Sequence, residues 1–365
     1  MDVAVDDLID GALEGPVFGL SQQEREARLV PVMRALTAHH REACIEYGRI
    51  VDAMFPASGP IDDPPQNPFL PVGIFKQRRL RSIPAVEVFK TITSSGTTGQ
   101  VPSRVDIDRR TANRQTQALT RILRSVLGEG RRPMLIVDTD AIAAGSDSRS
   151  ARAAGVVGLM PMGRKHTFLL DADMRPVEDR LLRFLAEHEG ERLLIFGFTF
   201  MVWKYLLEEF RGRGLDLSDA TLLHSGGWKH LEHERVDNSQ FRSMLGEAFG
   251  LRDIVNFYGM AEQVGSVFIE GPDQLLHPST FAEVIIRDPV TLEVQPDGTP
   301  GLVQVLSVVP TSYPGHSILT EDLGVIETVD DAHHGLGGKA FRVLGRIPHS
   351  ELRGCSDTFA ATTRG

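Results

Sequence analysis

The sequence predicts an α/β fold in which a mostly parallel sheet is covered by helices on both faces. Short apolar runs alternate with helical segments between residues 134 and 258, and such strands are typical of parallel sheets buried on both faces. The chain has 365 residues, of which 41% are apolar, so it is long enough to bury a large core. After about residue 264 the helical segments stop, and we expect a smaller antiparallel β-rich part there.

Hydrophobic periodicity places the individual elements. In the alternating region we expect strands over 134–137, 193–198, 221–224 and 254–258, and helices over 177–189, 200–211 and 231–249. Leu181, Leu182 and Leu185 are expected to share one face of the first of these helices. In the β-rich part we expect strands over 282–287, 302–309 and 324–328.

The region before the sheet is predicted to be helical over residues 21–53. Ser21 followed by Glu24 fits a capping box, and Pro31 is expected to kink or divide the segment because it has no backbone N–H. Six prolines between residues 56 and 73 indicate a connector.

These patterns divide the chain into three expected parts. They are an N-terminal helical segment (1–55), a core (56–340) with a β-rich subdomain from about residue 265, and a short, polar C-terminal segment (341–365).

Composition excludes several classes of protein. Lys and Arg number 39 and Asp and Glu 49, and a net charge of −10 disfavours general binding to nucleic acid or anionic lipid. No apolar run is long enough for a membrane span, and the N-terminus lacks the basic region of a signal peptide. Two cysteines, Cys44 and Cys355, exclude a disulfide scaffold and a Cys-rich zinc site, so we expect a cytoplasmic protein.

The strongest local signal is the run Thr93-Ser-Ser-Gly-Thr-Thr-Gly-Gln100. Glycines let backbone N–H groups approach an anion, and the hydroxyls add further donors around phosphate oxygens. The run follows a predicted strand over 86–93, and residues 104–132 beyond it hold eight Arg against three acidic residues. A surface turn would use the same residue types. The run lacks the Gly-Lys-Ser/Thr ending of a Walker A loop, which argues against a P-loop kinase or GTPase.

Three further motifs follow in the chain. Tyr258-Gly259-Met-Ala-Glu262 ends a predicted strand, where the ring of Tyr258 is suited to stack on a nucleobase and Glu262 to hold Mg²⁺. Asp322, in Glu-Asp-Leu-Gly, is suited to accept hydrogen bonds from two ribose hydroxyls, and Arg346 offers a guanidinium near a hinge. Each of these residues, taken alone, is also compatible with a core, turn or surface role.

Together and in this order, the four motifs resemble those of the acyl- and aryl-adenylate-forming enzymes. The resemblance implies an adenylate-forming large domain with a truncated C-terminal domain. It also implies that Mg²⁺ binds Glu262 and that ATP binds the phosphate loop, Tyr258 with Gly259, Asp322 and Arg346, the loop residues being Ser94, Ser95, Gly96, Thr97, Thr98 and Gly99.

Four longer stretches show a resemblance to one particular family of adenylate-forming enzymes. The runs from Phe89 to Gly99, His224-Ser-Gly-Gly-Trp-Lys229, Tyr313-Pro-Gly-His-Ser317 and Arg353-Gly-Cys-Ser356 are similar to the LuxE-type acyl-protein synthetases, from about residue 15 to residue 358. This resemblance implies a ligase that makes acyl-AMP from a carboxylic acid, with fatty acids as the expected substrates, and transfers the acyl group to its own cysteine. An acyl-accepting partner, a reductase or a carrier protein, would then receive it.

The sequence departs from the wider superfamily after the hinge, where a further domain ordinarily supplies a mobile lysine. Here 19 residues follow Arg346 and none is Lys. Lys229, next to Gly226 and Gly227 of the predicted ATP site, is our candidate substitute, and Lys165 and Lys204 are weaker ones. The sequence also has His333-His-Gly-Leu-Gly-Gly338 where luminous-type relatives tend to have cysteines.

Cys355 is the candidate acyl acceptor, because a thiolate is strongly nucleophilic and its thioester remains reactive. Arg353 nearby would favour the thiolate and Asp357 would oppose it, while the polar Arg-Gly-Cys-Ser-Asp setting disfavours burial.

The other candidate residues have less specific signals. Cys44, in a predicted helix, is expected in the core. The histidine pairs lack the partners of a closed metal site. Phe196, Phe198, Phe200 and Met201 either line the acyl pocket or belong to the core.

Two other functions remain open at this stage. A free-standing acid–AMP ligase would deliver its acyl group to coenzyme A, a carrier protein or an amine, and would not need Cys355. A non-catalytic subunit would keep the nucleotide site only to dock a reductase, although the presence of Glu262 and Asp322 argues against it.

Overall fold

The parallel half of a 12-stranded sheet forms one part of the molecule. The computed structural model describes residues 3–56, 59–94, 101–143, 151–331, 333 and 335–347. In the described part, five adjacent strands run parallel, and they are β5 (Gly163–Leu170), β4 (Arg132–Thr139), β6 (Leu193–Phe198), β7 (Ala220–Ser225) and β8 (Asp253–Met260). The α/β prediction with a parallel sheet is therefore confirmed.

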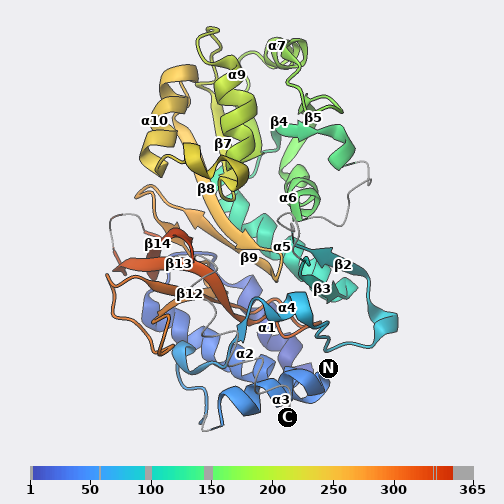
Figure 1. Ribbon diagram of the computed structural model, residues 1–365, viewed down its shortest axis with the longest axis vertical. Helices are drawn as coiled ribbons and strands as arrows, with labels where there is room; N and C mark the ends of the chain where they lie inside the picture. Colours follow the sequence, from blue (N-terminus) through green and yellow to red (C-terminus); the bar gives the residue numbers. More distant parts are fainter. Residues whose placement is uncertain are drawn as a thin grey trace.

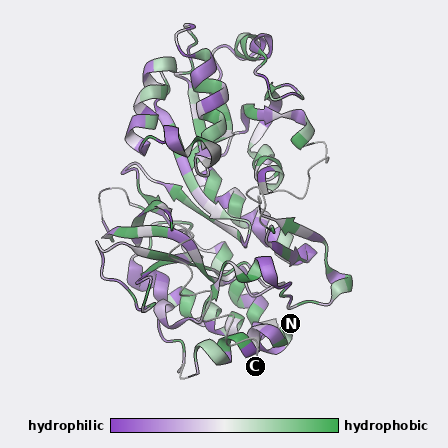
Figure 2. Ribbon diagram, viewed as in Figure 1, coloured by the Kyte–Doolittle hydropathy of each residue, from purple (hydrophilic) through white to green (hydrophobic). Residues whose placement is uncertain are grey.

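Helices connect these strands and cover the sheet (Figure 1). They are α5 (Arg109–Leu127), α6 (Ala151–Leu159), α7 (Glu178–Glu187), the continuous run of α8, η5 and α9 (Thr199–Phe210) and α10 (Asn238–Phe249). Short 3-10 turns precede and follow α6 at η3 (Asp140–Ile142) and η4 (Met160–Met162). Figure 2 shows apolar residues along the strands and polar residues on the outer faces of the helices.

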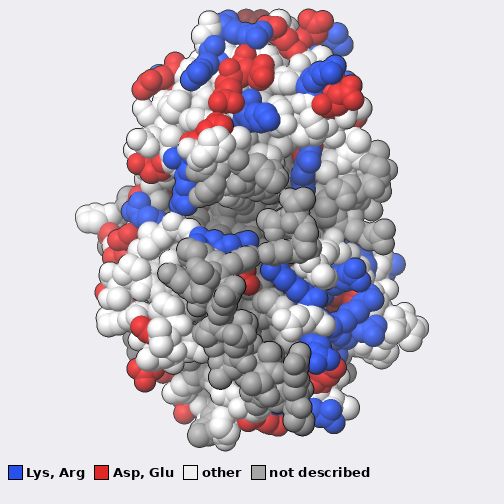
Figure 3. All heavy atoms as spheres, in the orientation of Figure 1, with Lys and Arg blue, Asp and Glu red and all other residues white. Residues whose placement is uncertain are grey.

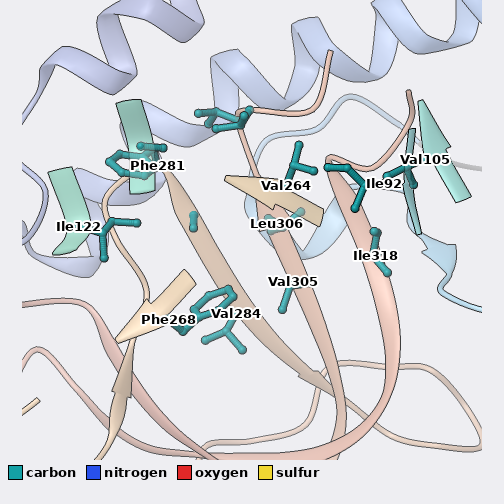
Figure 4. Close-up of a cluster of buried hydrophobic side chains, with 14 of the residues drawn as sticks. Ile92, Val105, Ile122, Val264, Phe268, Phe281, Val284, Val305, Leu306 and Ile318 are labelled. Atoms are coloured by element: carbon teal, nitrogen blue, oxygen red, sulfur yellow. The ribbon is translucent and has the colours of Figure 1, made fainter. Parts of the chain in front are cut away.

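The antiparallel half continues the same sheet through the pairing of β8 with β9. Its strands, in spatial order, are β9 (Gln263–Glu270), β10 (Leu276–His277), β14 (Lys339–Arg346), β13 (Ser317–Val329), β12 (Gly301–Ser307) and β11 (Ala282–Arg287). The β-rich part expected after residue 264 is thus present, hydrogen-bonded to the parallel half. Figure 4 shows the apolar side chains packed between these strands and their neighbours, Val264, Phe268, Val284, Val305 and Leu306 among them.

The N-terminal helices α1 (Val3–Glu14), α2 (Gln22–Ala43) and α3 (Ile45–Met54) lie beside the antiparallel half (Figure 1). The predicted capping box at Ser21 and Glu24 is present. Of the two effects predicted for Pro31, division of the helix is wrong, because Pro31 lies inside α2. Leu29 and Met33 on either side of it are buried, so packing continues the helix past the missing N–H.

The connector contains more structure than the prolines predict. It holds η1 (Pro64–Gln66) and the short β1 (Leu70–Pro71), which pairs in parallel with β13. Beyond it lie α4 (Ile74–Gln77) and η2 (Ala85–Glu87).

Several element boundaries differ from the predictions. The strand expected over 86–93 is only β2 (Lys90–Thr93), which pairs with β3 (Arg104–Ile107) in a separate two-stranded sheet. The helix expected over 231–249 is divided into η6 (Lys229–Glu234) and α10, because Asp237 forms a capping box that starts a new helix. The strand expected over 324–328 begins at Ser317, so it includes Asp322. The polar segment expected from residue 341 begins inside β14.

Leu182 was wrongly placed on the buried face of α7. Its side chain is 45% exposed, while Leu181 and Phe184 are buried. The buried stripe therefore follows positions i and i+3, and Leu185 is only partly buried. Among the described residues, no helix is both long and apolar enough to cross a lipid bilayer.

Two stacked histidines lie where α2 packs against the loop before β13. The rings of His40 and His316 are 4.8 Å apart and wholly buried. Nε2 of His40 lies 3.1 Å from the Pro310 carbonyl, so this nitrogen carries the proton, and Nδ1 accepts from the Ser82 hydroxyl at 2.7 Å. Burial and the neighbouring histidines keep the pKa of His40 well below its ordinary value, and burial lowers the pKa of His316 to about 3.

Acidification below pH 6.5 is therefore expected to destabilise the fold. The unfolded chain binds protons at these two imidazoles near pH 6.5, whereas the folded chain binds them only at much lower pH. The stability that they contribute is present above pH 6.5 and is lost as the pH falls toward 3. Between pH 7.5 and 5.5 the pair should lower the free energy of unfolding by about 3 kcal/mol. Urea denaturation at the two pH values measures this.

The exposed His333 provides the control for that measurement, because its side chain is 86% exposed. His333→Gln should leave the pH dependence unchanged, whereas His316→Gln should remove about half of the loss attributed to the pair. Equal pH dependence in all three proteins would contradict this explanation.

Candidate functional site

Three of the predicted nucleotide-binding residues lie together where β8 approaches β13 and β14. The Tyr258 hydroxyl donates a hydrogen bond to Oδ2 of Asp322 at 2.7 Å, and Nε of Arg346 lies 3.5 Å from Oδ1 of the same carboxylate. Asp322 and Arg346 are cross-strand partners in the β13–β14 ladder. Tyr258 and Arg346 are thus 88 positions apart in the sequence, yet both contact the carboxylate of Asp322.

Tyr258 is held as a neutral hydrogen-bond donor. Burial, and then the negative charge of Asp322, raises the pKa of its hydroxyl well above the ordinary value. The Asp322 side chain is 18% exposed, so its carboxylate remains accessible. Each carboxylate oxygen has two lone pairs, which leaves acceptor positions for the hydroxyls of a ligand.

Glu262 lies in the turn between β8 and β9 and is 7% exposed. Within the described part of the chain, its carboxylate makes no hydrogen bond or ion pair. Its backbone is fixed, because the Tyr313 hydroxyl donates to the Glu262 carbonyl at 2.9 Å and accepts from the Val264 N–H at 3.1 Å. A side chain at Gly315 would collide with Tyr313 and crowd the Glu262 carbonyl, so this position requires glycine.

The geometry at Glu262 fits an Mg²⁺ ion that arrives with other ligands. One unpaired carboxylate supplies a hard oxygen ligand, and Mg²⁺ takes most of its coordination from waters and substrate phosphates. Among the residues that the structure describes, no group of three His, Cys, Asp or Glu side chains is arranged so that it could hold a metal ion.

Gly226 and Gly227 follow β7 at the same edge of the sheet. Ser225 pairs with Phe257, which immediately precedes Tyr258, so the glycine turn lies level with Tyr258 on the neighbouring strand. Gly226 has φ of +84°, a conformation that favours glycine. Gly259, on the Tyr258 strand, lies close to Val267 of β9.

Two tryptophans anchor the turn that carries Lys229. The rings of Trp203 and Trp228 are 5.0 Å apart in an edge-on arrangement, and Nε1 of Trp203 donates to Glu234 at 2.9 Å. These contacts join both ends of η6 to the π-helical stretch η5 (Val202–Leu207). Lys229 begins η6, but its side chain lies outside what the structure describes.

Ser94 lies at the base of the predicted phosphate loop, in the β2–β3 hairpin. Its N–H donates to the Ser103 carbonyl at 3.1 Å, and its hydroxyl accepts from the Ser103 N–H at 2.9 Å. These bonds close the loop, but they do not join Ser94 to Tyr258 or Asp322. Lys and Arg side chains gather on the surface over this hairpin (Figure 3). Ser95, Gly96, Thr97, Thr98, Gly99 and Cys355 lie outside the described residues.

Comparison with known proteins identifies the family. The model of the family described as "Acyl-protein synthetase, LuxE" matches residues 2–363. The chain belongs to the LuxE family of acyl-protein synthetases. It is therefore a ligase of the AMP-forming type, as the sequence predicted.

Two relatives of this LuxE-family chain are long-chain-fatty-acid–luciferin-component ligases. The one from Aliivibrio fischeri is 23% identical over 305 residues, covering 80% of this chain and 78% of the relative. The one from Vibrio harveyi is 25% identical over 325 residues, covering 84% and 81%.

Solved structures show the fold of this LuxE-family chain. An open conformation of 2-hydroxyisobutyryl-CoA ligase, in complex with 2-HIB-AMP and CoA, superposes with a TM-score of 0.69 at 17% identity. The match covers 91% of this chain and 77% of that one. The same ligase in its thioesterification state also matches, with a TM-score of 0.69. The fold is that of the adenylate-forming enzymes, as the four motifs implied.

The remaining candidate site residues of the LuxE-family chain lie either in the core or near the surface. Cys44 is buried as expected, and burial raises the pKa of its thiol, which disfavours the reactive thiolate. Phe196 and Met201 are wholly buried, whereas Phe198 and Phe200 are partly exposed. Lys204 lies 5.4 Å over the ring of Tyr205, and Lys165 is exposed.

Sequence reasoning missed the residues that support the site. Tyr313 was noticed within its motif, but its hydroxyl contact with the Glu262 backbone was not foreseen. Trp203 and Glu234 were not singled out at all. The presence of only two tryptophans, one of them beside the Gly-Gly turn, was the available signal.

Proposed function

We propose that this LuxE-family enzyme activates a fatty acid, or another carboxylic acid, with ATP and then carries the acyl group on Cys355. The convergence of Tyr258 and Arg346 on Asp322 carries the proposal, because it provides an accessible carboxylate beside an aromatic ring. The names of the two relatives support a long-chain fatty acid as the substrate.

Two bond exchanges account for the reaction. A carboxylate oxygen of the acid attacks the α-phosphorus of ATP, pyrophosphate leaves, and acyl-AMP forms. The Cys355 thiolate then attacks the acyl carbon, AMP leaves, and a thioester forms. Because both partners of the first step are anionic, that step needs positive charge and hydrogen-bond donors around the phosphates.

In this proposal Asp322 accepts hydrogen bonds from the ribose hydroxyls, and the Tyr258 ring packs against adenine. Arg346, 3.5 Å from Asp322, is proposed to orient the carboxylate and to donate to a phosphate or ribose oxygen. The loop from Ser94 to Gly99 supplies backbone and hydroxyl donors to the phosphates, as its composition suggests. Gly226, Gly227 and Gly259 let the backbone approach the nucleotide.

Lys229 is our candidate for the lysine that neutralises the reacting carboxylate and phosphate. Its backbone follows the Gly226–Gly227 turn, and the contacts between Trp203 and Trp228 fix that turn against the sheet. The turn that precedes Lys229 lies level with Tyr258 on the neighbouring strand.

Glu262 is proposed to bind the Mg²⁺ that accompanies ATP, which screens the phosphate charge. Glu262→Gln is expected to raise the Mg²⁺ concentration for half-maximal activity by about tenfold or more, because a charged ligand is replaced by a neutral one. Titration of pyrophosphate exchange with Mg²⁺ measures this effect. Glu129→Gln, at an acid whose side chain is 84% exposed, is the matched control. A Glu262→Gln titration that overlays the wild type would remove Glu262 from the metal site.

The acyl group is proposed to pass from Cys355 to a partner protein, a reductase or a carrier. A thioester suits this step because it is reactive toward a second thiol or a hydride donor. Delivery to coenzyme A or an amine is the competing outcome, and it would not require Cys355.

ATP–pyrophosphate exchange tests the proposal. Labelled pyrophosphate should enter ATP only when a suitable acid is present, and a panel of fatty and aryl acids should identify it. Exchange that is absent with every acid would leave a non-catalytic nucleotide-binding subunit as the better description.

A further inference from the structure

A cavity of about 670 Å³ lies between α3, the connector and the end of β11. Its wall combines the apolar side chains of Met54, Phe55, Phe69 and Leu292 with one buried arginine, Arg287. The Phe55 and Phe69 rings are 5.0 Å apart, edge to face, and form one side. Of the residues of the proposed nucleotide site, none of those that the structure describes lines this cavity.

Arg287 is a buried cation that no carboxylate of a described residue neutralises. It is 6% exposed, and it donates to three neutral oxygens. Nε donates to Oε1 of Gln304 at 2.5 Å, Nη1 to the Leu292 carbonyl at 2.8 Å and Nη2 to the Pro65 carbonyl at 2.6 Å. The guanidinium carbon also lies 4.7 Å from the centre of the Phe69 ring. Buried charges in proteins are ordinarily paired, so this arrangement lacks an anion.

The hydrogen bonds of Arg287 leave donors for such an anion. A guanidinium has five N–H groups, and three are used. The two that remain belong to Nη1 and Nη2, one on each, and these two nitrogens can donate together to one carboxylate. Burial lowers the pKa of Arg287 to about 10, so it stays charged at neutral pH.

The charge of the cavity selects a monoanion. Its one acidic lining residue, Asp62, is exposed and paired with Nη2 of Arg34 at 3.0 Å. The net charge left to neutralise is therefore that of Arg287 alone. A carboxylate balances it, whereas a phosphate monoester would bring excess negative charge beside Asp62.

We propose that this cavity binds an amphipathic carboxylate, with its head group on Arg287 and its alkyl chain along Phe55, Phe69 and Leu292. A free fatty acid has this chemistry, and naming it as the natural occupant rests on the function proposed above. The site is separate from the reacting one.

The cavity lies behind the strand that carries Asp322. Phe69 packs with Leu302, Leu319 and Ile347, and Leu323 contacts this cluster. Successive residues of a strand point to opposite faces, so Leu323 contacts the cavity side while Asp322 contacts Tyr258. A bound carboxylate would thus stabilise β13 from the face opposite the nucleotide site.

Photolabelling tests the proposal on the full chain without ATP. The probe is dodecanoic acid with a diazirine at its alkyl end, and labelled peptides are mapped by mass spectrometry. We expect label within residues 54–69 and 287–292, and Arg287→Gln should reduce it by about 10- to 100-fold, as for the loss of a charged hydrogen-bonding group. Dodecanol should not compete. Arg175→Gln, at an arginine that is 77% exposed, should label like the wild type.

Thr291→Glu keeps the test decisive if Arg287→Gln does not fold. Thr291 is an exposed residue of the cavity wall, and a carboxylate there would neutralise Arg287 from within the chain. This variant should also lose label at these peptides. Label confined to other peptides, or unchanged label in both variants, would overturn the proposal. Pyrophosphate exchange is measured independently, so a failure of the proposed catalytic function would not remove label that depends on Arg287.

Discussion

Asp322→Asn is expected to lower acid-dependent ATP–pyrophosphate exchange by about 100-fold or more. The substitution removes the charge that two ribose hydroxyls would meet, and hydrogen bonds to charged groups are worth about 1.5–3 kcal/mol each. It also places an amide next to Arg346, which the carboxylate now faces at 3.5 Å. The loss should appear in kcat/KM for ATP, measured at saturating acid.

Tyr258→Phe is the matched control for this substitution. It removes one hydrogen bond to Asp322 but keeps the aromatic ring, so we expect only about a 3- to 10-fold loss. Unchanged unfolding midpoints would show that both variants keep the fold. If Asp322→Asn retained nearly full exchange, the nucleotide would have to bind elsewhere.

Glu283→Gln is expected to lower the free energy of unfolding by about 3 kcal/mol or more. Glu283 is wholly buried on β11, where Oε1 lies 3.6 Å from Nζ of Lys339 and accepts from the Val284 N–H, and Oε2 accepts from Gln22. Arg25 of α2 is also fully buried and donates to the Ser279 and Ala282 carbonyls. Removing the one carboxylate would leave two cations without a buried anion, which is strongly destabilising.

The pKa of Glu283 is set by burial on one side and by the two neighbouring cations on the other. Burial alone would raise it, but Lys339 and then Arg25 outweigh burial and hold the pKa below its ordinary value. The network therefore stabilises the fold above the unfolded pKa of a glutamate, about 4.3, and this contribution is lost as the pH falls further.

Glu327→Gln is the control, since its ion pair with Arg342 is largely exposed and should contribute well under 1 kcal/mol. Urea denaturation at pH 7.5 compares the two variants. Equal midpoints would mean that the network joining α2 to the sheet contributes no net stability.

Most of the fold was predictable from the sequence, because hydrophobic periodicity is detectable in most strands and helices and the motifs are spread over most of the chain. The parallel strands β4, β6 and β7 are runs of buried apolar residues, which periodicity detects directly. The parallel strand β5 was missed, because it contains Arg, Lys and His and is buried only in part. Pro31 failed as a helix breaker because tertiary packing on both sides outweighs a missing hydrogen bond. The prediction for Leu182 was wrong because α7 buries only a narrow stripe that contains Leu181 and Phe184 and leaves Leu182 exposed.

The sequence predicted which residues form the candidate site, but it did not predict which of them contact one another. Tyr258 and Asp322 carry recognisable motifs, but only the packing of β8 against β13 shows that one hydrogen-bonds the other. Arg287 and Glu283 carry no motif, and their importance comes from burial, which depends on strands far apart in the chain. The roles of Cys355, Lys229 and the phosphate loop stay predictions.

Acyl transfer to Cys355 is best tested by the mass of the intact protein after incubation with Mg-ATP and a panel of fatty and aryl acids. We expect an acyl adduct with one acid or a narrow set of acids, removed by hydroxylamine and absent in Cys355→Ala, while AMP release continues in that variant. A chain that releases AMP in an acid-dependent way but never gains an adduct would contradict acyl transfer to Cys355, and would indicate a free-standing ligase.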